Sequence, residues 1–286
     1  MFIRDGILYR SDVLCTVPGV LHGFSGRAGG VSVLEHTHSL NLTAGLGDPD
    51  ETVRANTGIF CRAVSGGLYG AEAGVKARQI HSAKIRLLGA SHAGEGAVRP
   101  AAEGEDGECD GFVTDAPGVL PMIRVADCVP ILFAGLKDGD PARPVVAAVH
   151  AGWRGTAAGI APKAVRLMRE MGCPASSLRC AVGPHIGACC YEVGEDFVEA
   201  VASLCGREFA KTHIRPVLLP DGTRSPKPHA DLAGMNRALL LEAGLAEGQI
   251  DFSPDCTACS DPASYYSHRR MKGVRGTQGA GIVILP

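Results

Sequence analysis

VVAAVHAGWRGT, residues Val145 to Thr156, passes from a run of small and branched apolar residues into a turn bounded by glycine. The run Val145 to His150 predicts a buried strand. From Thr156 to Met171 apolar residues recur at helical spacing, and the pattern ends at Gly172. The sequence therefore predicts a strand, a tight turn and a helix, with His150 at the end of the strand.

Working outward, the rest of the chain mixes strand and helix signals. Helices are predicted from Asp48, as N-cap, to about Ala63, over Glu195 to Cys205, and from the Asp231 cap to Gly244. Further strands are predicted for Ile7 to Val13, Val75 to Leu88, Gly111 to Thr114, Val119 to Arg124, Val129 to Phe133 and Gly281 to Leu285. Because strands and helices do not alternate strictly, we expect an α+β fold in a single domain, residues 1–286.

Composition narrows the classes of partner and compartment. The 286 residues carry a formal net charge of −2, and 45% of them are hydrophobic. The hydrophobic fraction is typical of a globular protein with a large core. The slightly negative net charge argues against nucleic acid or a membrane as partner. Arg4, Asp5 and Arg10 interrupt the apolar run that a signal peptide would need, so we predict a cytoplasmic protein. A polar stretch from Gly94 to Asp110 predicts a solvated loop.

The chain has 11 Cys and 10 His, which raises the question of metal or thiol chemistry. An odd number of thiols argues against a disulfide framework. His81, Cys128 and His150 each lie at the edge of a strand-like run, separated by long intervals typical of a catalytic metal site with three protein ligands. The alternatives are a hydrogen-bonded structural histidine and, for Cys128, a small buried apolar residue.

The motifs resemble one family over nearly the whole chain. The most specific are Ala126-Asp-Cys-Val-Pro130 and His150-Ala-Gly-Trp-Arg-Gly155, accompanied by Ser39-Leu-Asn-Leu42 and Tyr265-Tyr-Ser-His-Arg-Arg270. They resemble the bacterial purine nucleoside phosphorylases with a laccase-like domain, historically called multicopper polyphenol oxidases and also linked to peptidoglycan editing.

This resemblance implies that His81, Cys128 and His150 bind one zinc ion. It also implies phosphorolysis of adenosine and inosine to a free base and ribose 1-phosphate, with methylthioadenosine cleavage and adenosine deamination as related activities. The implied fold is a layered α/β/β/α arrangement of mixed sheets, similar to the catalytic domain of deamidating bacterial toxins. The expected partners are a purine nucleoside and phosphate.

Four further residues are candidates for the reaction. Arg154 offers a planar guanidinium for phosphate, although it also suits a structural arginine packed on Trp153. Ser39 and Asn41, in the family's Ser-Leu-Asn motif, are candidates for ribose or base contacts, with turn capping as the alternative. Asp127 is a candidate for the general acid or base by position alone.

Two rival functions use the same residues. Cys128 with His150 also suits the thiol nucleophile and base of a hydrolase or amidase acting in peptidoglycan precursor editing. A metal-binding protein without catalytic activity is the third hypothesis. Copper is disfavoured, because His36-Thr-His38 is the one His-x-His pair and multicopper oxidases need several. For Cys256 and Cys259 a simple thiol pair is expected, and Cys189 and Cys190 are expected to pack beneath the site. Sequence leaves the oligomeric state open.

Overall fold

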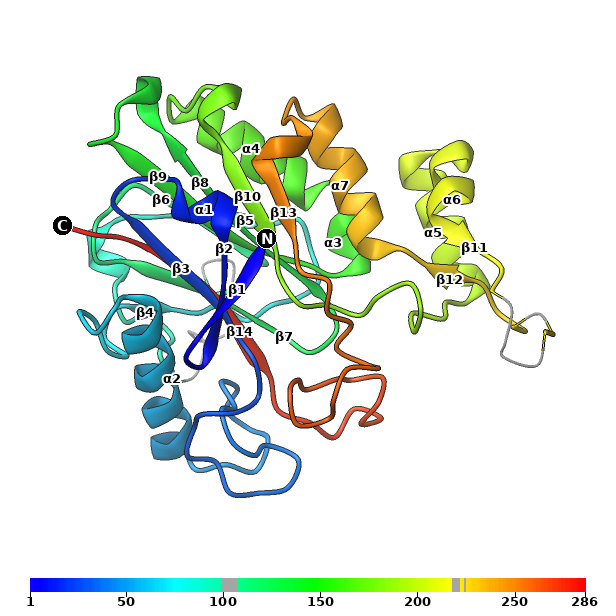
Figure 1. Cartoon of the computed structure of the whole chain (residues 1–286), viewed down its shortest axis with the longest axis horizontal. Coiled ribbons are helices and arrows are strands. Elements are labelled where there is room, and N and C mark those ends of the chain that lie inside the picture. The colour runs from blue at the N-terminus through cyan, green and yellow to red at the C-terminus, as the bar shows by residue number, and fades with distance from the viewer. Residues whose placement is uncertain (99–106, 218–221, 224) are drawn as a thin grey trace.

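Two β-sheets packed face to face, with helices on both outer faces, form the core of the computed structural model (Figure 1). The structure describes residues 1–98, 107–217, 222–223 and 225–286. The order of layers is α/β/β/α, which confirms the predicted fold. The predicted polar loop between Gly94 and Asp110 lies partly outside the described residues.

The first sheet is mixed, with antiparallel neighbours except for its last pair, β7 and β4, which is parallel. Its strands, in spatial order, are β1 (Phe2–Asp5), β2 (Leu8–Ser11), β3 (Val20–Ser25), β14 (Gln278–Ile284), β7 (Leu120–Val125) and β4 (Gly74–Val75). The C-terminal strand therefore lies in the middle of this sheet, beside a strand from the N-terminus.

The second sheet is also mixed, with an antiparallel centre and a parallel pair at each edge. Its strands, in spatial order, are β13 (Ile250–Phe252), β10 (Arg179–Val182), β8 (Val129–Leu136), β9 (Pro144–Ala151), β6 (Gly111–Thr114) and β5 (Ile85–Leu88). A separate two-stranded ribbon pairs β11 (Ile214–Arg215) with β12 (His229–Ala230).

Helices cover the outer face of each sheet (Figure 1). The helices of the described residues are α1 (Asp12–Cys15), α2 (Asp50–Val64), α3 (Trp153–Ala157), α4 (Ile160–Glu170), α5 (Glu195–Cys205), α6 (Arg207–His213) and α7 (Leu232–Glu242). Of these, α2 covers the first sheet, α4 and α7 cover the second, and α5 and α6 lie beside the sheets (Figure 1). Short 3-10 turns lie at Ala90–His92, Lys137–Gly139, Ala175–Ser177 and Glu247–Gln249. None of the helices in the described part of the chain has the length and apolar character needed to cross a bilayer.

Three apolar clusters hold the four layers together. Phe60 and Val64 of α2 pack on Leu120 of β7 at the outer face of the first sheet. Between the sheets, apolar residues of β3, β7 and β14 meet those of β8, β9 and β10. On the other side, α4 and α7 cover the outer face of β8 and β9. Because residues on both faces of β8 and β9 are buried, these strands read as continuous apolar runs in the sequence.

The helix predicted for Thr156 to Met171 is two helices. Gly159 adopts a left-handed backbone conformation, with φ of 75°, and separates α3 from α4. The first of them begins at Trp153, three residues earlier than predicted. The turn after His150 is therefore shorter and tighter than the sequence pattern indicates.

The prediction of a single strand from Val75 to Leu88 is wrong, and the difference determines where His81 lies. The chain leaves the first sheet after β4, crosses to the second sheet, and joins it at β5. His81 lies on this crossing loop, where hydrogen bonds to a buried carboxylate replace strand pairing.

Two element boundaries also differ from prediction. The strand predicted for Ile7 to Val13 ends at Ser11, where α1 begins. Asp48 does not cap α2, which begins at Asp50, because the Asp48 carboxylate accepts hydrogen bonds from neighbouring loop residues instead. By contrast, Asp231 caps α7 as predicted, accepting from the backbone of Gly234 at 2.8 Å.

Candidate metal centre

His81, Cys128 and His150 meet where three chain segments come to the same edge of the sheets. The ligand atoms of the three side chains all lie within 4.8 Å of one another. Cys128 is in the turn by which the chain passes from β7 to β8, and the pairing of Pro130 with His150 brings that turn beside β9. The rings of His81 and His150 are 4.8 Å apart and nearly perpendicular.

Asp110, fully buried, organises two of the three segments. One carboxylate oxygen lies 2.8 Å from Nδ1 of His150 and accepts the backbone N–H of His81 at 3.0 Å. The other accepts from Ser82, through its backbone N–H and hydroxyl. Because Nδ1 of His150 is engaged by Asp110, Nε2 is the nitrogen left for a metal. A carboxylate behind a ligating histidine is a usual feature of zinc sites.

Two residues of the centre have unusual backbone conformations. His81 has φ of 59° and Asp127 has φ of 99°, values that side-chain-bearing residues rarely adopt. The Asp127 carboxylate is held by the hydroxyl of Thr257 at 2.6 Å and the backbone N–H of Arg269 at 2.7 Å. The backbone thus has a strained conformation at two of the three segments, at His81 itself and at the residue before Cys128.

Gly152 makes room for the His81 ring. A Cβ atom at this position would lie 2.6 Å from Nδ1 of His81 and 3.4 Å from Sγ of Cys128. The first distance is shorter than any normal contact, so an alanine would displace the imidazole. This explains a glycine directly after the strand that carries His150.

Cys128 and His150 polarise each other. Burial opposes ionisation of the Cys128 thiol, but the positive charge of His150 and hydrogen bonds from both imidazoles outweigh it and lower the pKa of Cys128 to about 6. Burial likewise opposes protonation of His150, yet the Cys128 thiolate and Asp110 raise the pKa of His150 to about 9. The centre therefore favours a thiolate, which is the form that binds metal ions.

The donor set fits a soft or borderline metal ion. Two imidazole nitrogens and one thiolate are ligands of zinc and of copper, and three protein ligands leave a further position open. Among the described residues, the groups able to hold a metal are this trio and a separate cluster of four cysteines. His36, from the predicted His-x-His pair, contacts the Leu46 carbonyl and belongs to neither group.

A pocket of about 320 Å³ opens beside the three side chains. Its volume lies within the range of small-ligand sites. Besides the trio, it is lined by Thr43, Ala44, Arg78, Gln79, Arg124, Val125, Ala126, Arg275 and Thr277. Three arginines thus border the pocket, although the protein as a whole is slightly negative.

Two of these arginines have hydrogen-bonding capacity to spare. Within the described part of the chain, Nε of Arg124 and Nε of Arg275 are buried and have no hydrogen-bond partner. Burial lowers the pKa of Arg124 to about 10, and burial also lowers that of Arg275, but both guanidiniums stay protonated near neutral pH. Buried, charged and unpaired donors are costly unless a ligand engages them.

Three other predicted site residues, Ser39, Asn41 and Arg154, do not line this pocket. Asn41, fully buried, accepts hydrogen bonds from the backbones of Thr43 and Thr277 and so supports the pocket wall from behind. Ser39 accepts from the backbone of Gly30. Arg154 is exposed, with its guanidinium 4.2 Å from the centre of the Trp153 ring. Contacts of these side chains with substrate remain predictions.

The sequence model of the multi-copper polyphenol oxidoreductase laccase family matches residues 21–285. The chain belongs to this laccase family. It is 36% identical over 278 residues to a protein from Geobacillus stearothermophilus named purine nucleoside phosphorylase YlmD, an alignment that covers 93% of this chain and 92% of the relative. It is also 36% identical over 176 residues, or 60% of this chain and 61% of the relative, to a prokaryotic protein named adenosine deaminase RL5.

Solved structures of the laccase family agree with the fold. The structure of Bacillus licheniformis YfiH superposes with a TM-score of 0.82 at 28% sequence identity, covering 99% of this chain and 98% of that one. The names of the relatives indicate an enzyme of nucleoside chemistry, in agreement with the predicted class. The family name refers to copper, and the metal of this chain is not identified by the names of the two relatives.

Sequence reasoning missed three residues of this laccase-family site. The sequence places Asp110 only in a polar loop, and Arg124 only at the end of a predicted strand. A charged residue inside a buried strand was itself the signal, because such residues are rarely buried without a purpose. Arg275 gave no comparable signal, since it lies in a stretch without periodicity and reaches the pocket through the fold.

Proposed function

We propose that this protein is a zinc-dependent purine nucleoside phosphorylase. It would cleave adenosine, inosine and methylthioadenosine with inorganic phosphate, giving the free base and a ribose 1-phosphate or its methylthio analogue. The observation that carries the proposal is that one pocket combines a His-Cys-His centre with two arginines, Arg124 and Arg275, whose Nε atoms are buried and have no partner among the described residues. The name of the Geobacillus relative supports the same reaction class, and the name of the second relative supports a purine nucleoside as substrate.

We assign phosphate binding to Arg124 and Arg275. Planar guanidiniums bind phosphate oxygens through paired hydrogen bonds, and here burial strengthens the attraction. Phosphorolysis requires such a subsite, because phosphate must be held against the anomeric carbon of the ribose while the bond to the base breaks. Arg154, in the first turn of α3, is the second candidate for binding phosphate. Ser39 and Asn41 remain candidates for binding the nucleoside.

Zinc is the metal we assign to His81, Cys128 and His150. A bound zinc ion would supply Lewis-acid polarisation of an oxygen in the pocket, which suits adenosine deamination as a second activity. Asp110 orients the imidazole of His150 and holds the loop of His81, so that the donor atoms are arranged before the metal binds. Asp127, fixed by Thr257 and Arg269, positions the turn that presents Cys128.

The test is a nucleoside assay with and without phosphate on metal-free protein reloaded with zinc or with copper. We expect release of base from adenosine or inosine only with both zinc and phosphate. Release of base at the same rate without phosphate would contradict phosphorolysis. Activity restored by copper and not by zinc would contradict the metal assignment.

A second candidate function has a specific observation in its favour. His150 contacts both Cys128 and Asp110, an arrangement found in thiol hydrolases. The pKa of Cys128 is lowered to about 6, which favours the nucleophilic thiolate. In that case Cys128 would attack a carbonyl, as in an amidase of peptidoglycan precursors. A thiolate that holds a metal is not free to do so.

Alkylation separates the two functions. Under the phosphorylase proposal, Cys128 in the zinc-loaded protein resists iodoacetamide and becomes reactive after chelation. A Cys128 that is alkylated rapidly in zinc-loaded protein, with loss of amide hydrolysis, would favour the thiol hydrolase. If neither assay detects turnover while zinc binds tightly, the remaining hypothesis is a metal-binding protein without catalysis.

A further inference from the structure

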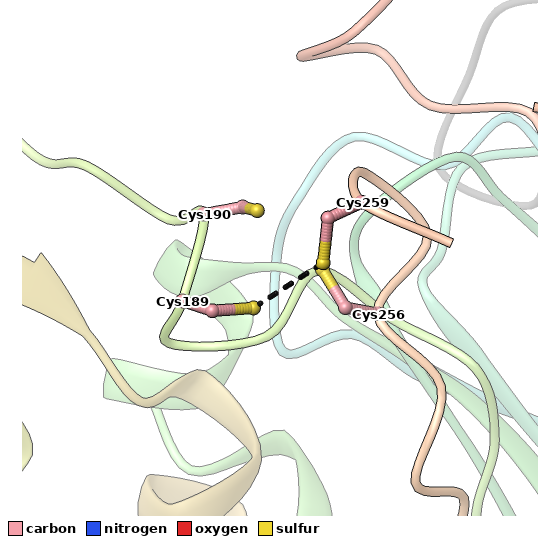
Figure 2. Close-up of side chains that lie close together, drawn as sticks. All are labelled: Cys189, Cys190, Cys256 and Cys259. Carbon is pink, nitrogen blue, oxygen red and sulfur yellow. Dashed lines mark hydrogen bonds between the residues drawn. The ribbon is translucent and has the colours of Figure 1, made fainter. Parts of the chain in front are cut away.

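Four cysteines gather in a second cluster, which the reaction proposed above does not use. Cys189 and Cys190 come from the loop after β10, and Cys256 and Cys259 from the loop after β13, with the four side chains turned toward one another (Figure 2). Their sulfur atoms all lie within 4.8 Å of one another. Two loops about seventy residues apart in sequence thus meet at the thiols, beside a β-bridge between His185 and Cys256.

The spacing of these sulfur atoms suits a tetrahedral metal site. Zinc binds thiolates at about 2.3 Å, and four ligands at the corners of a tetrahedron are then about 3.8 Å apart. The sulfur atoms of Cys189 and Cys259 are 3.6 Å apart, and no two of the four sulfur atoms are more than 4.8 Å apart. Cys256 and Cys259 have the Cys-x-x-Cys spacing typical of structural zinc sites.

The backbone around Cys256 is arranged to stabilise a thiolate. The backbone N–H of Gly187 points to the Cys256 sulfur at 3.2 Å, linking the two loops. Burial opposes ionisation of Cys256, but N–H groups of Gly187, Cys259 and Ala258 outweigh it and lower its pKa. Burial and neighbouring thiols raise the pKa of Cys189 to about 11. The two loops are therefore linked at the sulfur of Cys256 by a backbone N–H group.

Two arginines provide compensating charge close to the cluster. Arg270 donates to the carbonyls of Thr257, at 2.6 Å, and of Ala258, at 3.2 Å, between the paired cysteines. Arg269 donates to the carbonyls of Cys190, at 3.4 Å, and of Glu192, at 2.7 Å. Four thiolates around a divalent cation leave a net charge of −2, which positive groups at this distance offset.

We propose that Cys189, Cys190, Cys256 and Cys259 bind a second zinc ion in a structural site. Four protein thiolates fill the coordination sphere, so this site has no open position for substrate, unlike the trio of His81, Cys128 and His150. On binding, each thiol gives up its proton to solvent and forms one sulfur–zinc bond.

The second site stabilises the turn that carries Cys128. Thr257, which lies between the paired cysteines, donates to the Asp127 carboxylate, and the backbone N–H of Ile186 donates to the Asp127 carbonyl at 2.8 Å. Both cysteine-bearing loops therefore contact Asp127, the residue before Cys128. Zinc at the cluster would fix these loops relative to each other and thereby the position of Cys128.

The test is the zinc content of four proteins purified under reducing conditions. We expect about two zinc ions per chain in the wild type and in Cys15→Ser, whose exposed cysteine lies outside both clusters. We expect about one in Cys256→Ser/Cys259→Ser and about one in Cys128→Ser. After cobalt replacement, most of the thiolate-to-cobalt absorption should be lost in the double variant, since the cluster supplies four thiolates and the trio one.

A measurement on the wild type covers the case in which the double variant fails to fold. Cys189 and Cys259 are exposed, as is Cys15, so all three should be alkylated if no metal is bound. We expect Cys15 to be alkylated at once, and the other two only after chelation. Alkylation of all three at similar rates, a Cys189–Cys259 disulfide in the reduced preparation, or zinc content that falls to zero in Cys128→Ser would overturn the proposal.

Discussion

Asp110 shows how much of the metal centre depends on one carboxylate. Its oxygens engage His150 Nδ1, the backbone of His81 and both polar groups of Ser82, although the residue contributes no ligand atom. Despite burial, these hydrogen bonds and the charge of His150 lower the pKa of Asp110. It therefore acts as a permanent anion that fixes the orientation of one ligand and the loop of another.

We expect Asp110→Asn to weaken zinc binding by about 10- to 100-fold, the range seen when the partner of a ligating histidine is changed. The amide keeps the shape but loses the charge and some acceptors. Competition with a chromogenic chelator measures the affinity. Asp115→Asn, at an exposed position paired with Lys137, is the control and should bind zinc like the wild type. Equal affinity in both variants would mean that Asp110 has no influence on the metal.

Arg275→Gln and Arg154→Ala compare the two candidate phosphate sites. Since hydrogen bonds to charged groups contribute about 1.5 to 3 kcal/mol, we expect the phosphate KM to rise about 10- to 100-fold in Arg275→Gln, with zinc content unchanged. A smaller effect is expected for Arg154→Ala, because this guanidinium packs on Trp153. Steady-state kinetics at varied phosphate gives both values. A larger rise of the phosphate KM in Arg154→Ala than in Arg275→Gln would show that Arg154 binds the phosphate.

At the level of elements, the backbone of the turn between β9 and α3 passes close to the imidazole of His81, one of the three proposed metal ligands. Gly152→Ala places a methyl group against Nδ1 of His81, so we expect it to lose zinc and activity while remaining folded. Gly159→Ala is the matched control, since no atom lies within 4 Å of the position that a Cβ would take there and the strain is in the backbone. It should lose about 1 kcal/mol of stability and keep its zinc. Metal analysis with circular dichroism on both variants checks this, and zinc-replete Gly152→Ala would contradict it.

His22 on β3 makes a specific prediction about acid stability. Its Nε2 accepts the backbone N–H of Ser11 at 2.8 Å, and burial, aided by Arg10 and opposed by Asp251, lowers its pKa from 6.5 to about 3. Below pH 6.5 the unfolded chain binds a proton that the native protein does not, so the free energy of unfolding falls as the pH falls from 6.5 toward 3.

We expect this residue to contribute about 2 kcal/mol of destabilisation between pH 7 and pH 5. His22→Gln keeps an acceptor and removes the titration, so its stability should fall less over the same interval. Urea unfolding of both proteins at the two pH values measures the difference. Parallel losses in wild type and variant would show that another group is responsible.

Across the whole molecule, local patterns predicted what depends on local sequence. The strand of His150 and the cap at Asp231 were predicted correctly, because buried β-runs and caps are visible in short windows. The three side chains predicted to share a metal do lie together, and their binding of zinc stays a prediction. The crossing loop of His81 was missed, since Asp110 holds it from a distant position in the chain. The four-cysteine cluster was missed for the same reason, as the two loops meet only in the folded protein.

The layered arrangement also explains why chemistry concentrates at one edge. The chain passes between the sheets at the loop of His81 and again at the turn of Cys128, and these two crossings lie beside the end of β9. Polar and strained backbone at this edge is stabilised by buried side chains, mainly Asp110 and Asp127. A slightly negative protein is compatible with the phosphate substrate that we propose, because Arg124 and Arg275 place positive charge at the pocket.

The most direct measurement follows the oxygen that reaches the sugar. Zinc-loaded protein is incubated with adenosine and phosphate in water labelled with heavy oxygen, and the products are analysed by mass spectrometry. We predict unlabelled ribose 1-phosphate, since the attacking oxygen comes from phosphate, with any label confined to the purine as a record of deamination. Free ribose in place of ribose 1-phosphate, formed at the rate of base release, would contradict the central claim, because water and not phosphate would then be the nucleophile.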